Sequence, residues 1–326
     1  MNIRVPSIAI LTALALTCAS ASAAAAESVY PVKPIRVIVG FPPGGSADIF
    51  ARLVGQKLTE SWGQQVVVDN RPGAGSTIGS EIAANSAADG YTLMVVSASY
   101  ATSAGLYRHL KYDPIRSFAP VTLISSTPNL FLAYPSFPAK TASDLITTAR
   151  ANPGKFTLGS SGTGSITHLT GVLFASMAKL NFVDVPYKGG APSLNALMGG
   201  QINLLFLSLP ASLGQVKAGR VRVLAVTSAK RSAVLPEVPT IAESGVAGYE
   251  ATNWYGMLAP AGTSMRIVDK LNAQIVEILR SREMADMVAK QGAEAVGSAP
   301  QAFGVYLKSE IAKWSKVIKQ AGLRAE

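Results

Sequence analysis

The stretch FPPGGSADIFAR, residues 41–52, directly follows a short apolar run and predicts a junction between a buried strand and a helix. The run Ile35–Val39 is the strand candidate, the Pro-Gly segment forms a turn, and Ser46 and Asp48 open a helical pattern. Such a turn leaves unpaired backbone N–H groups at the positive end of the helix dipole, where anions bind. The stretch therefore predicts an anion-binding corner.

A second junction of the same kind, GSSGTGSITHL, occupies residues 159–169. Its glycines and small hydroxyl residues let a ligand oxygen approach backbone and hydroxyl donors together, although the same hydroxyls are ordinary caps for a helix that begins near Ser165. Two such corners in one chain suggest a clamp that holds a small anion from both sides.

Apolar runs and helical patterns alternate along the chain, which is typical of parallel α/β structure. The runs are nearly continuous in Val, Ile and Leu, as expected for strands that are covered on both faces. The predicted strands are residues 35–41, 66–69, 92–97, 156–159, 202–207 and 221–227, and the predicted helices between them are residues 48–60, 78–85, 143–151, 165–179 and 192–198. Apolar stripes predict two further helices, one through Ile267, Leu271, Ile275 and Ile278 and one through Leu307, Ile311, Trp314 and Ile318.

Two segments, residues 118–135 and residues 221–260, have the pattern of crossings between domains. A chain that leaves one α/β unit and later returns to it gives that unit two pieces. We therefore predict a discontinuous first domain, residues 27–126 plus 250–326, and a second domain, residues 127–249.

The N-terminus predicts a secretory signal peptide, residues 1–26. Arg4 supplies the positive start, residues 8–16 form the apolar core, and ASAAAAE contains the cleavage site, after Ala26 or Ala23. The apolar core is too short for a membrane-spanning helix. The processed protein is therefore expected in an exported compartment.

The composition argues against several chemistries. The single cysteine, Cys18, lies in the predicted signal peptide, so neither a disulfide nor a thiol site is expected in the processed chain. The two histidines, His109 and His168, lack the cysteine partners of a usual zinc site, so we expect no metal and no cofactor. The formal net charge of +10 comes from scattered basic residues without a basic run, which favours anionic solutes over nucleic acid as partners.

Seven motifs occur in a characteristic order: FPPGGSADIFAR (41–52), VVVDNRPGAGSTIG (66–79), ADGYTLMV (88–95), GSSGTGSITHL (159–169), VPYKGGAPSLNALMGGQIN (185–203), AVTSAKRSAVLPEVPTIAESGVAGYE (225–250) and WYGMLAPAGT (254–263). With these motifs the chain resembles the Bug/TctC family, the periplasmic substrate-binding receptors of tripartite tricarboxylate transporters. The resemblance implies two lobes of the type II periplasmic-binding-protein kind, each a mostly parallel sheet flanked by helices, with the ligand cleft between them. It also implies a monomer that captures a small aliphatic or aromatic carboxylate, passes it to membrane permease subunits and performs no chemistry.

The two corners and the strand end at Ser97 supply most of the predicted ligand contacts. Asp48 is interpreted as a first-turn residue that favours the helix dipole, and His168, one turn into its helix, either packs there or contacts the ligand. Leu207 stands where the family often has an acidic residue, so a ligand without an ammonium group is expected. The predicted ligand-binding residues are Phe41, Gly44, Gly45, Ser46, Ala47, Ser97, Ser99, Tyr100, Ser161, Thr163, Gly164, Ser165, His168 and Leu207.

Other functions compete with transport. A dinucleotide-dependent enzyme is disfavoured because Ile78 stands where the third glycine of G-x-G-x-x-G, counted from Gly73, would fall. A serine hydrolase with Ser161 as nucleophile is disfavoured because Thr163 breaks the G-x-S-x-G pattern and neither histidine has an obvious orienting acid. A periplasmic sensor domain that signals to a membrane kinase would use the same lobes and remains an alternative.

Overall fold

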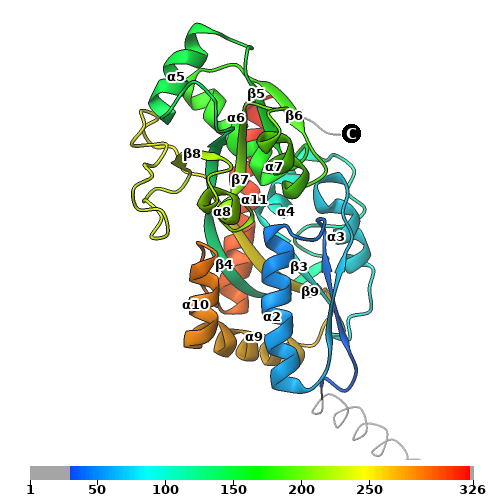
Figure 1. Ribbon diagram of the computed structural model, residues 1–326. Helices are drawn as coiled ribbons and strands as arrows, with labels where there is room; N and C mark the ends of the chain where they lie inside the picture. The colour runs from blue at the N-terminus through cyan, green and yellow to red at the C-terminus, as the bar shows by residue number, and fades with distance from the viewer. Residues whose placement is uncertain (1–29, 324–326) are drawn as a thin grey trace, which may run out of the picture.

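The computed structural model describes residues 30–323, and the predicted signal peptide lies outside the described residues. The described chain forms two α/β lobes, one above the other in Figure 1, which share one ten-stranded sheet. The strand order is β2-β1-β3-β9-β4-β7-β5-β6, and β8 and β10 both pair with β4. This arrangement confirms the predicted two-lobed α/β fold. Within residues 30–323, no helix is long and apolar enough to cross a membrane.

The lower lobe is built on three parallel strands that lie side by side. Its central strand β1 is almost entirely buried: its Val and Ile residues are fully buried, and only Arg36 is partly exposed. Each strand leads into a helix, so the helix N-termini gather at the edge of the sheet where the strands end. The strands are β1 (Ile35–Val39), β2 (Val66–Asn70) and β3 (Thr92–Ser97), and the helices are α2 (Ser46–Trp62), α3 (Thr77–Ala84, preceded by the short turn η1, Ala74–Ser76) and α4 (Ala98–Leu106).

The upper lobe repeats this arrangement with a second set of parallel strands, β6, β5 and β7. Strand β6 was not predicted from the sequence, because it is an edge strand with mostly exposed residues and therefore has no buried apolar run. The elements in chain order are α5 (Ala142–Ala151), β5 (Thr157–Ser160), α6 (Ile166–Ala178), β6 (Val183–Pro186), α7 (Gly190–Met198), β7 (Leu204–Ser208) and α8 (Leu209–Lys217).

The lobes are joined through the long strand β4 (Phe118–Ala133) and its antiparallel neighbours. The first part of β4 pairs with β9 (Thr252–Pro260) in the lower lobe, and its last residues pair with β7 and β8 (Arg222–Val226) in the upper lobe. Parallel pairing is thus confined to the outer strands, whereas the strands that cross between the lobes are antiparallel. The assignment of residues 27–126 plus 250–326 and of residues 127–249 to separate domains stays a prediction.

The C-terminal segment covers the lower lobe and the back of the sheet with three helices, α9 (Met265–Arg280), α10 (Arg282–Lys290) and α11 (Pro300–Gln320), and adds the short strand β10 (Glu294–Ala295). Both predicted apolar stripes face inward: Leu271 and Ile275 of α9 and Trp314 of α11 are fully buried. Helix α11 packs against α4 and β4 and also reaches α6 of the upper lobe. It therefore contacts both lobes.

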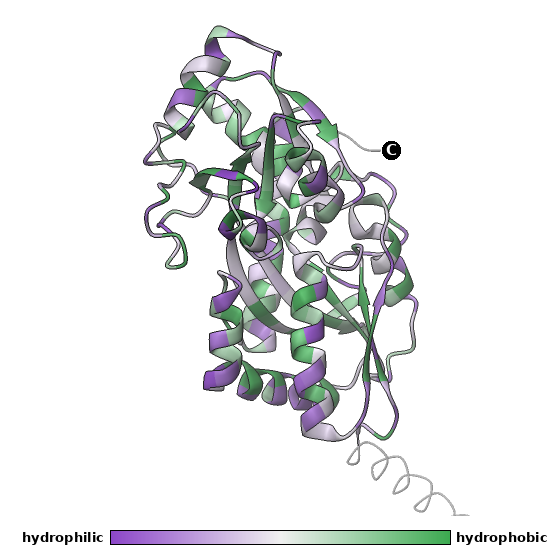
Figure 2. Cartoon of the chain, in the orientation of Figure 1, coloured by the Kyte–Doolittle hydropathy of each residue, from purple (hydrophilic) through white to green (hydrophobic). Residues whose placement is uncertain are grey.

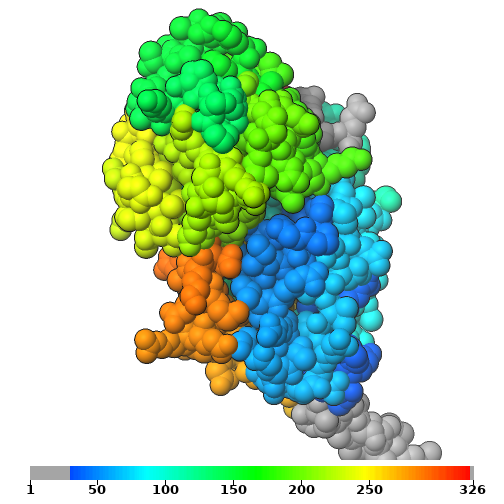
Figure 3. All heavy atoms as spheres, in the orientation of Figure 1, coloured from blue at the N-terminus to red at the C-terminus, as the bar shows by residue number. Residues whose placement is uncertain are grey.

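Hydropathy follows these layers. In Figure 2 the strands are mostly hydrophobic, and hydrophilic residues lie on the outward faces of the surrounding helices. The space-filling view shows the two lobes meeting across the middle of the molecule, where the N-terminal end of α2, in blue, abuts the green upper lobe (Figure 3). The contact zone between the lobes is where both predicted corners lie.

Candidate functional site

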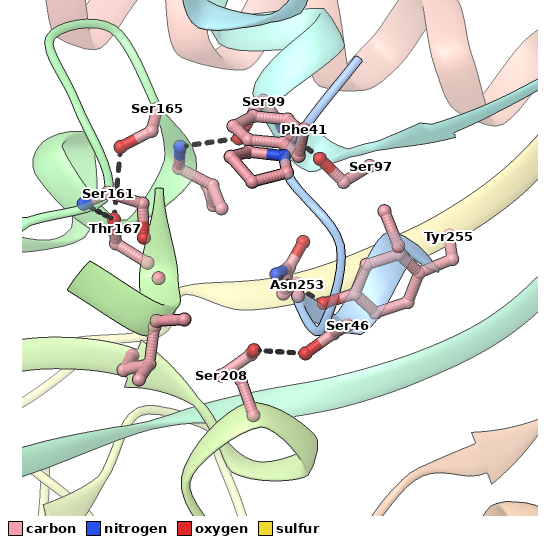
Figure 4. Close-up of a pocket in the computed structure, with 18 of the residues that line it drawn as sticks. Phe41, Ser46, Ser97, Ser99, Ser161, Ser165, Thr167, Ser208, Asn253 and Tyr255 are labelled. Carbon is pink, nitrogen blue, oxygen red and sulfur yellow. Dashed lines mark hydrogen bonds between the residues drawn. The ribbon is translucent and has the colours of Figure 1, made fainter. Parts of the chain in front are cut away.

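A small cavity of about 50 Å³ lies between the lobes, beneath the N-terminal end of α2 (Figure 4). It has room for a few water molecules, which is also the size of one carboxylate group. Both lobes and the crossing strand β9 line it. The lining residues are Phe41, Pro42, Pro43, Gly45, Ser46, Ala47, Ser97, Ser99, Ser161, Ser165, Ile166, Thr167, Gly190, Ala191, Leu207, Ser208, Ala211, Asn253 and Tyr255.

Five helices begin at this cavity: α2 and α4 from the lower lobe and α6, α7 and α8 from the upper lobe. Each helix N-terminus carries the equivalent of about half a positive charge. Among the residues that line the cavity, none has a charged side chain. The site therefore attracts an anion through backbone dipoles and hydroxyl groups rather than through arginine or lysine.

The β1–α2 corner presents bare backbone donors. Gly45 is the N-cap of α2 and gives it no side-chain cap, and no acceptor in the described chain takes the N–H groups of Ser46 and Ala47. The N–H of Gly44, in contrast, donates to Asp48 Oδ2 at 3.0 Å. Ser46 and Ala47 therefore keep donors free for a ligand, whereas the N–H of Gly44 is already used within the protein.

Asp48 points away from the cavity and stabilises the corner from behind. Its carboxylate accepts hydrogen bonds from Gly44, from Arg52 Nε at 3.0 Å and from Asn70 Nδ2 at 3.0 Å. Burial raises the pKa of Asp48, but these hydrogen bonds outweigh burial and hold the pKa below its usual value. Asp48 therefore stays ionised at neutral pH, and its role is structural.

The β5–α6 corner is shaped differently, because its donors are largely taken. Ser165 caps α6 by accepting from His168 N, and Ser161 N donates to Thr167 Oγ1 at 2.9 Å. Ile166 N donates to Ser99 Oγ of α4 at 2.9 Å, and Thr102 of α4 donates to the carbonyl of Gly164. This corner is held by its own hydroxyls and by the opposite lobe.

The floor of the cavity is a network of neutral polar groups. Asn253 Nδ2 donates to the hydroxyl of Tyr255 at 2.8 Å, and burial raises the pKa of Tyr255 to about 12, which keeps its phenol protonated. Beside it, Ser46 Oγ and Ser208 Oγ lie 2.5 Å apart and form a hydrogen bond between the two lobes. Together with the contacts of Ser99 and Thr102, this bond links the two lobes beside the cavity.

The structure brings nine of the predicted residues into the cavity and leaves five outside it. Those that line it are Phe41, Gly45, Ser46, Ala47, Ser97, Ser99, Ser161, Ser165 and Leu207. Those that do not are Gly44, Tyr100, Thr163, Gly164 and His168.

Tyr100 lies in the core rather than in the cavity. It is fully buried, packs against Tyr112 and Phe118, and donates from its hydroxyl to the carbonyl of Pro114 at 2.7 Å. The sequence analysis placed Tyr100 in the segment that follows the strand end, but α4 begins at Ala98, so the residue after Ser99 turns to the opposite side.

The remaining displaced residues belong to the β5–α6 corner. Gly164 has φ +77 and leaves no space for a side chain, because a Cβ there would meet Leu106. The ring of His168 faces away from the cavity toward Asp184 of β6, and Thr163 lines a neighbouring cavity. The chain turns into α6 here, and this turn places Thr163, Gly164 and the ring of His168 outside the inner cavity.

Several lining residues were not predicted from the sequence. Asn253 and Tyr255 come from β9, a segment interpreted only as a crossing, and Ser208 follows the last residue predicted for its strand. The alternation of Asn253 and Tyr255 on one face of the strand was an available signal, because residues two apart share a face. Gly190 and Ala191 at the start of α7 carry no distinctive pattern.

A larger outer cavity of about 730 Å³ adjoins the first, and the two share Phe41, Pro42 and Ser161 as walls. The outer cavity is lined by residues 72–76, by the β5–α6 corner and by residues 186–189. Among its described lining residues, Lys188 is the one with a formal charge. A molecule too long for the inner cavity can extend past Phe41 into this space.

Comparisons with known proteins agree on one family. The family model of the tripartite tricarboxylate transporter family receptor (TctC) matches residues 50–323. The UPF0065 protein in the tcbD-tcbE intergenic region of Pseudomonas sp. (strain P51) is 37% identical over 314 residues, which cover 96% of this chain and 93% of that protein. Protein BugT of Bordetella pertussis is 35% identical over 319 residues, covering 97% of this chain and 98% of that protein.

Solved structures give the same result. R. palustris Rpa4515 with adipate has a TM-score of 0.88 at 40% identity and covers 90% of this chain and 99% of its own. MatC (Rpa3494) from Rhodopseudomonas palustris with bound malate has a TM-score of 0.84 at 30% identity, covering 89% of this chain and 100% of its own. The periplasmic binding protein BugD has a TM-score of 0.87 at 33% identity and covers 91% of this chain and 100% of its own.

Proposed function

The chain belongs to the tripartite tricarboxylate transporter receptor (TctC) family, and on that basis we propose that it is a periplasmic solute-binding protein that captures a carboxylate between its lobes. The observation that carries the proposal is the convergence of five helix N-termini on a cavity without charged side chains. The positive ends of these helix dipoles suit a carboxylate group, and the unpaired amides of Ser46 and Ala47 can donate to it without a counter-charge from a side chain. The partner that receives the ligand is the membrane permease of such a transporter.

The cavity volumes favour an elongated acid. The inner cavity of about 50 Å³ matches one carboxylate group, and the outer cavity of about 730 Å³ has room for the rest of the molecule. Lys188 beside the outer cavity offers a partner for a second carboxylate. Two relatives of solved structure hold dicarboxylates, adipate in Rpa4515 and malate in MatC. A dicarboxylate whose first acid group binds the amides of Gly45 to Ala47 fits these features.

An amino acid fits less well. An ammonium group needs a carboxylate or several acceptors around it. The described lining of both cavities contains no acidic side chain, and the position of Leu207 is apolar. We therefore expect the site to discriminate against ligands that carry an ammonium group.

Hydrolysis by Ser161 is disfavoured by the position of His168. The Nδ1 atom of His168 accepts from the N–H of Gly164 at 3.3 Å, and Nε2 lies 3.5 Å from Asp184 Oδ2. Nδ1 is thus occupied as an acceptor, Nε2 carries the proton of the neutral ring, and His168 does not line the cavity that contains Ser161, so the ring is not placed to take a proton from that hydroxyl. A binding function without chemistry agrees with this geometry.

Isothermal titration calorimetry on the protein without residues 1–26 tests the proposal. The ligands to compare are adipate and malate with two acid groups, citrate with three, benzoate with one, and glutamate, which has two acid groups and an ammonium group. We expect a dicarboxylate to bind in the micromolar range, which corresponds to about 8 kcal/mol, and glutamate to bind far more weakly. Absence of binding by all these acids, or a co-crystal with the acid group away from Gly45 to Ala47, would contradict the proposal.

A further inference from the structure

His168 lies directly behind the ligand site without lining it. It occupies the first turn of α6 and is buried, and its Nδ1 accepts a hydrogen bond from the N–H of Gly164 at 3.3 Å. The other side of the ring faces a third cavity, of about 140 Å³, where Nε2 lies 3.5 Å from Asp184 Oδ2. The ring therefore connects the loop of the ligand site to the edge strand β6.

The loop that His168 holds also carries the contacts between the lobes. The carbonyl of Gly164 accepts a hydrogen bond from Thr102 of α4, and Ile166 N donates to Ser99 Oγ of the same helix. Leu106 at the end of α4 and Tyr107, which follows it, pack against Gly164, whose φ of +77 residues with a side chain rarely adopt. The Gly164 peptide is thus one of the groups through which α4 contacts the start of α6.

The hydrogen bond to His168 depends on the protonation state of the ring. A neutral imidazole has one nitrogen that accepts, and the N–H of Gly164 selects Nδ1 for that role. A protonated imidazole has two N–H donors, so Nδ1–H would face the N–H of Gly164 with no acceptor between them. Protonation must therefore displace either the ring or the Gly164 peptide.

We propose that His168 is a positioning residue whose neutral ring holds Gly164, so that protonation of the ring loosens the contact between the lobes and weakens ligand binding. The inference rests on the proposed function only where ligand affinity is the readout. It makes the closed state of the protein dependent on pH.

The surroundings of the ring set the direction of the effect. Burial lowers the pKa of His168, and the nearby carboxylate of Asp184 opposes this shift. On the lobe facing Gly164, Tyr107 is a titratable neighbour whose pKa burial raises, so it stays neutral. Among the described residues that line the cavity around the ring, Asp184 is the acidic one. His168 is therefore neutral at pH 7.5, and the contact is lost as the pH falls below the ordinary histidine value.

Two readouts test the inference. Calorimetry with adipate at pH 7.5 and pH 5.0 should show about a fivefold or greater loss of affinity at the lower pH in the wild type. The ¹⁵N resonances of the imidazole, recorded without ligand, should show Nδ1 unprotonated at pH 7.5, and the Gly164 amide resonance should shift with the titration of His168.

Variants separate positioning from general packing. His168→Ala should bind adipate weakly at both pH values, and His168→Asn, whose Oδ1 can accept from Gly164, should restore binding and remove the added pH dependence. His109→Asn is the matched control, because His109 is exposed and is the other histidine of the chain. It should keep the pH profile of the wild type.

Equal pH dependence in the wild type and in His168→Asn would overturn the inference. So would a Gly164 resonance that does not follow the ring, even in a protein that binds adipate normally. If adipate fails to bind the wild type at pH 7.5, the proposed ligand class fails, and the imidazole and Gly164 resonances alone then decide the role of His168.

Discussion

The two corners that face each other across the cavity have the same strand–turn–helix construction but use their backbone donors in opposite ways. At the β1–α2 corner the N-cap is Gly45, which gives no side-chain cap, and the N–H groups of Ser46 and Ala47 have no acceptor within the described chain. At the β5–α6 corner Ser165 caps its own helix, and the N–H of Ile166 is taken by Ser99 of the other lobe. The first corner is open to an anion, whereas the second is built for contact between the lobes.

This difference assigns the two corners different tasks in closure. Unpaired donors at a helix N-terminus bind a carboxylate because nothing within the protein competes for them. Donors that already have partners add little to ligand binding. Where the partner belongs to the other lobe, as Ser99 does for Ile166, the hydrogen bond instead stabilises the contact between the lobes. Under the proposed function, the lower lobe would supply the free amides for the acid group, and the upper lobe would close over it.

The largest expected effect comes from Gly45→Val, which tests the open corner directly. The backbone of Gly45 has φ −78, which any residue adopts, and a Cβ there would have ordinary contact with Pro42 at 3.6 Å. The fold should therefore survive, while the branched side chain occupies the space of the ligand. We expect the affinity for the best carboxylate to fall by about a hundredfold or more, roughly 3 kcal/mol, as measured by calorimetry.

Gly214→Val is the matched control for this variant. Gly214 lies on the exposed side of α8, and a Cβ at this position would have no neighbouring atom within 4 Å. The variant should bind like the wild type. Unchanged affinity in Gly45→Val would mean that the acid group binds elsewhere and that the contrast between the corners does not govern recognition.

Ser99→Ala removes a contact between α4 and the β5–α6 corner and should have the next largest effect. Loss of Ser99 Oγ leaves the buried N–H of Ile166 without its partner from the opposite lobe. An unsatisfied buried donor costs about 1–3 kcal/mol. We expect affinity to fall by about tenfold, with a larger radius of gyration in solution scattering because the lobes open.

Ser80→Ala provides the comparison for Ser99→Ala. Ser80 is another fully buried serine of the lower lobe, but its hydroxyl donates to Ser76 at the start of α3 rather than across the cleft. Its loss should leave the radius of gyration unchanged. Equal scattering curves for Ser99→Ala and the wild type would show that this contact does not control closure.

The sequence predicted both corners, but not how they differ. Whether an amide is free depends on partners from distant parts of the chain: the acceptor for Ile166 is Ser99, 67 residues earlier. The pattern GSSGTGS is compatible with groups that donate to a ligand and with groups that cap the following helix. Which of the two applies depends on the position of α4, which the pattern does not contain. The fold was easier to predict, because apolar runs and stripes are local signals that do not depend on such partners.

Single residues were misplaced where a boundary mattered. Tyr100 was assigned to the site because it follows the strand end, but the helix starts at Ala98 and turns its ring into the core. Asn253 and Tyr255 were missed because the strand that carries them reaches the cavity only through the crossing between the lobes. Neither fact is local in sequence.

Lys188→Met should have a smaller effect, because Lys188 is exposed. Its ammonium group lies at the outer cavity, next to the β5–α6 corner, while the inner cavity has no charged side chain in its lining. An exposed ion pair is worth about 1 kcal/mol or less, so affinity for adipate should fall by roughly threefold to fivefold at low salt. Hexanoate, which has the same carbon count but one acid group, should be unaffected.

Lys217→Met, at the end of α8 and away from both cavities, is the control for this change. An equal loss for adipate and hexanoate would assign Lys188 a general electrostatic effect instead of a contact with the second acid group. If the loss of adipate affinity in Lys188→Met disappears at high salt, while hexanoate shows no loss at any salt concentration, the contact of Lys188 with the second acid group is supported, because salt screens an exposed ion pair.

Asp48→Asn should have the smallest effect on binding and instead lower stability, because Asp48 holds the open corner from behind. Its carboxylate accepts from Gly44, Arg52 and Asn70, and these hydrogen bonds keep its pKa below the usual carboxyl value. A lowered pKa means that the stabilisation is present above the ordinary carboxyl pKa and is lost as the pH falls through the lowered value. We expect the variant to lose about 1–2 kcal/mol in its free energy of unfolding by urea at pH 7, and this free energy should decline less steeply as the pH is lowered.

Asp269→Asn, on an exposed turn of α9, is the control and should match the wild type at pH 7 and in acid. If Asp48→Asn proved as stable as the wild type at pH 7, the Gly44 amide would not depend on this carboxylate, and the open corner would have to be held by its glycine turn alone.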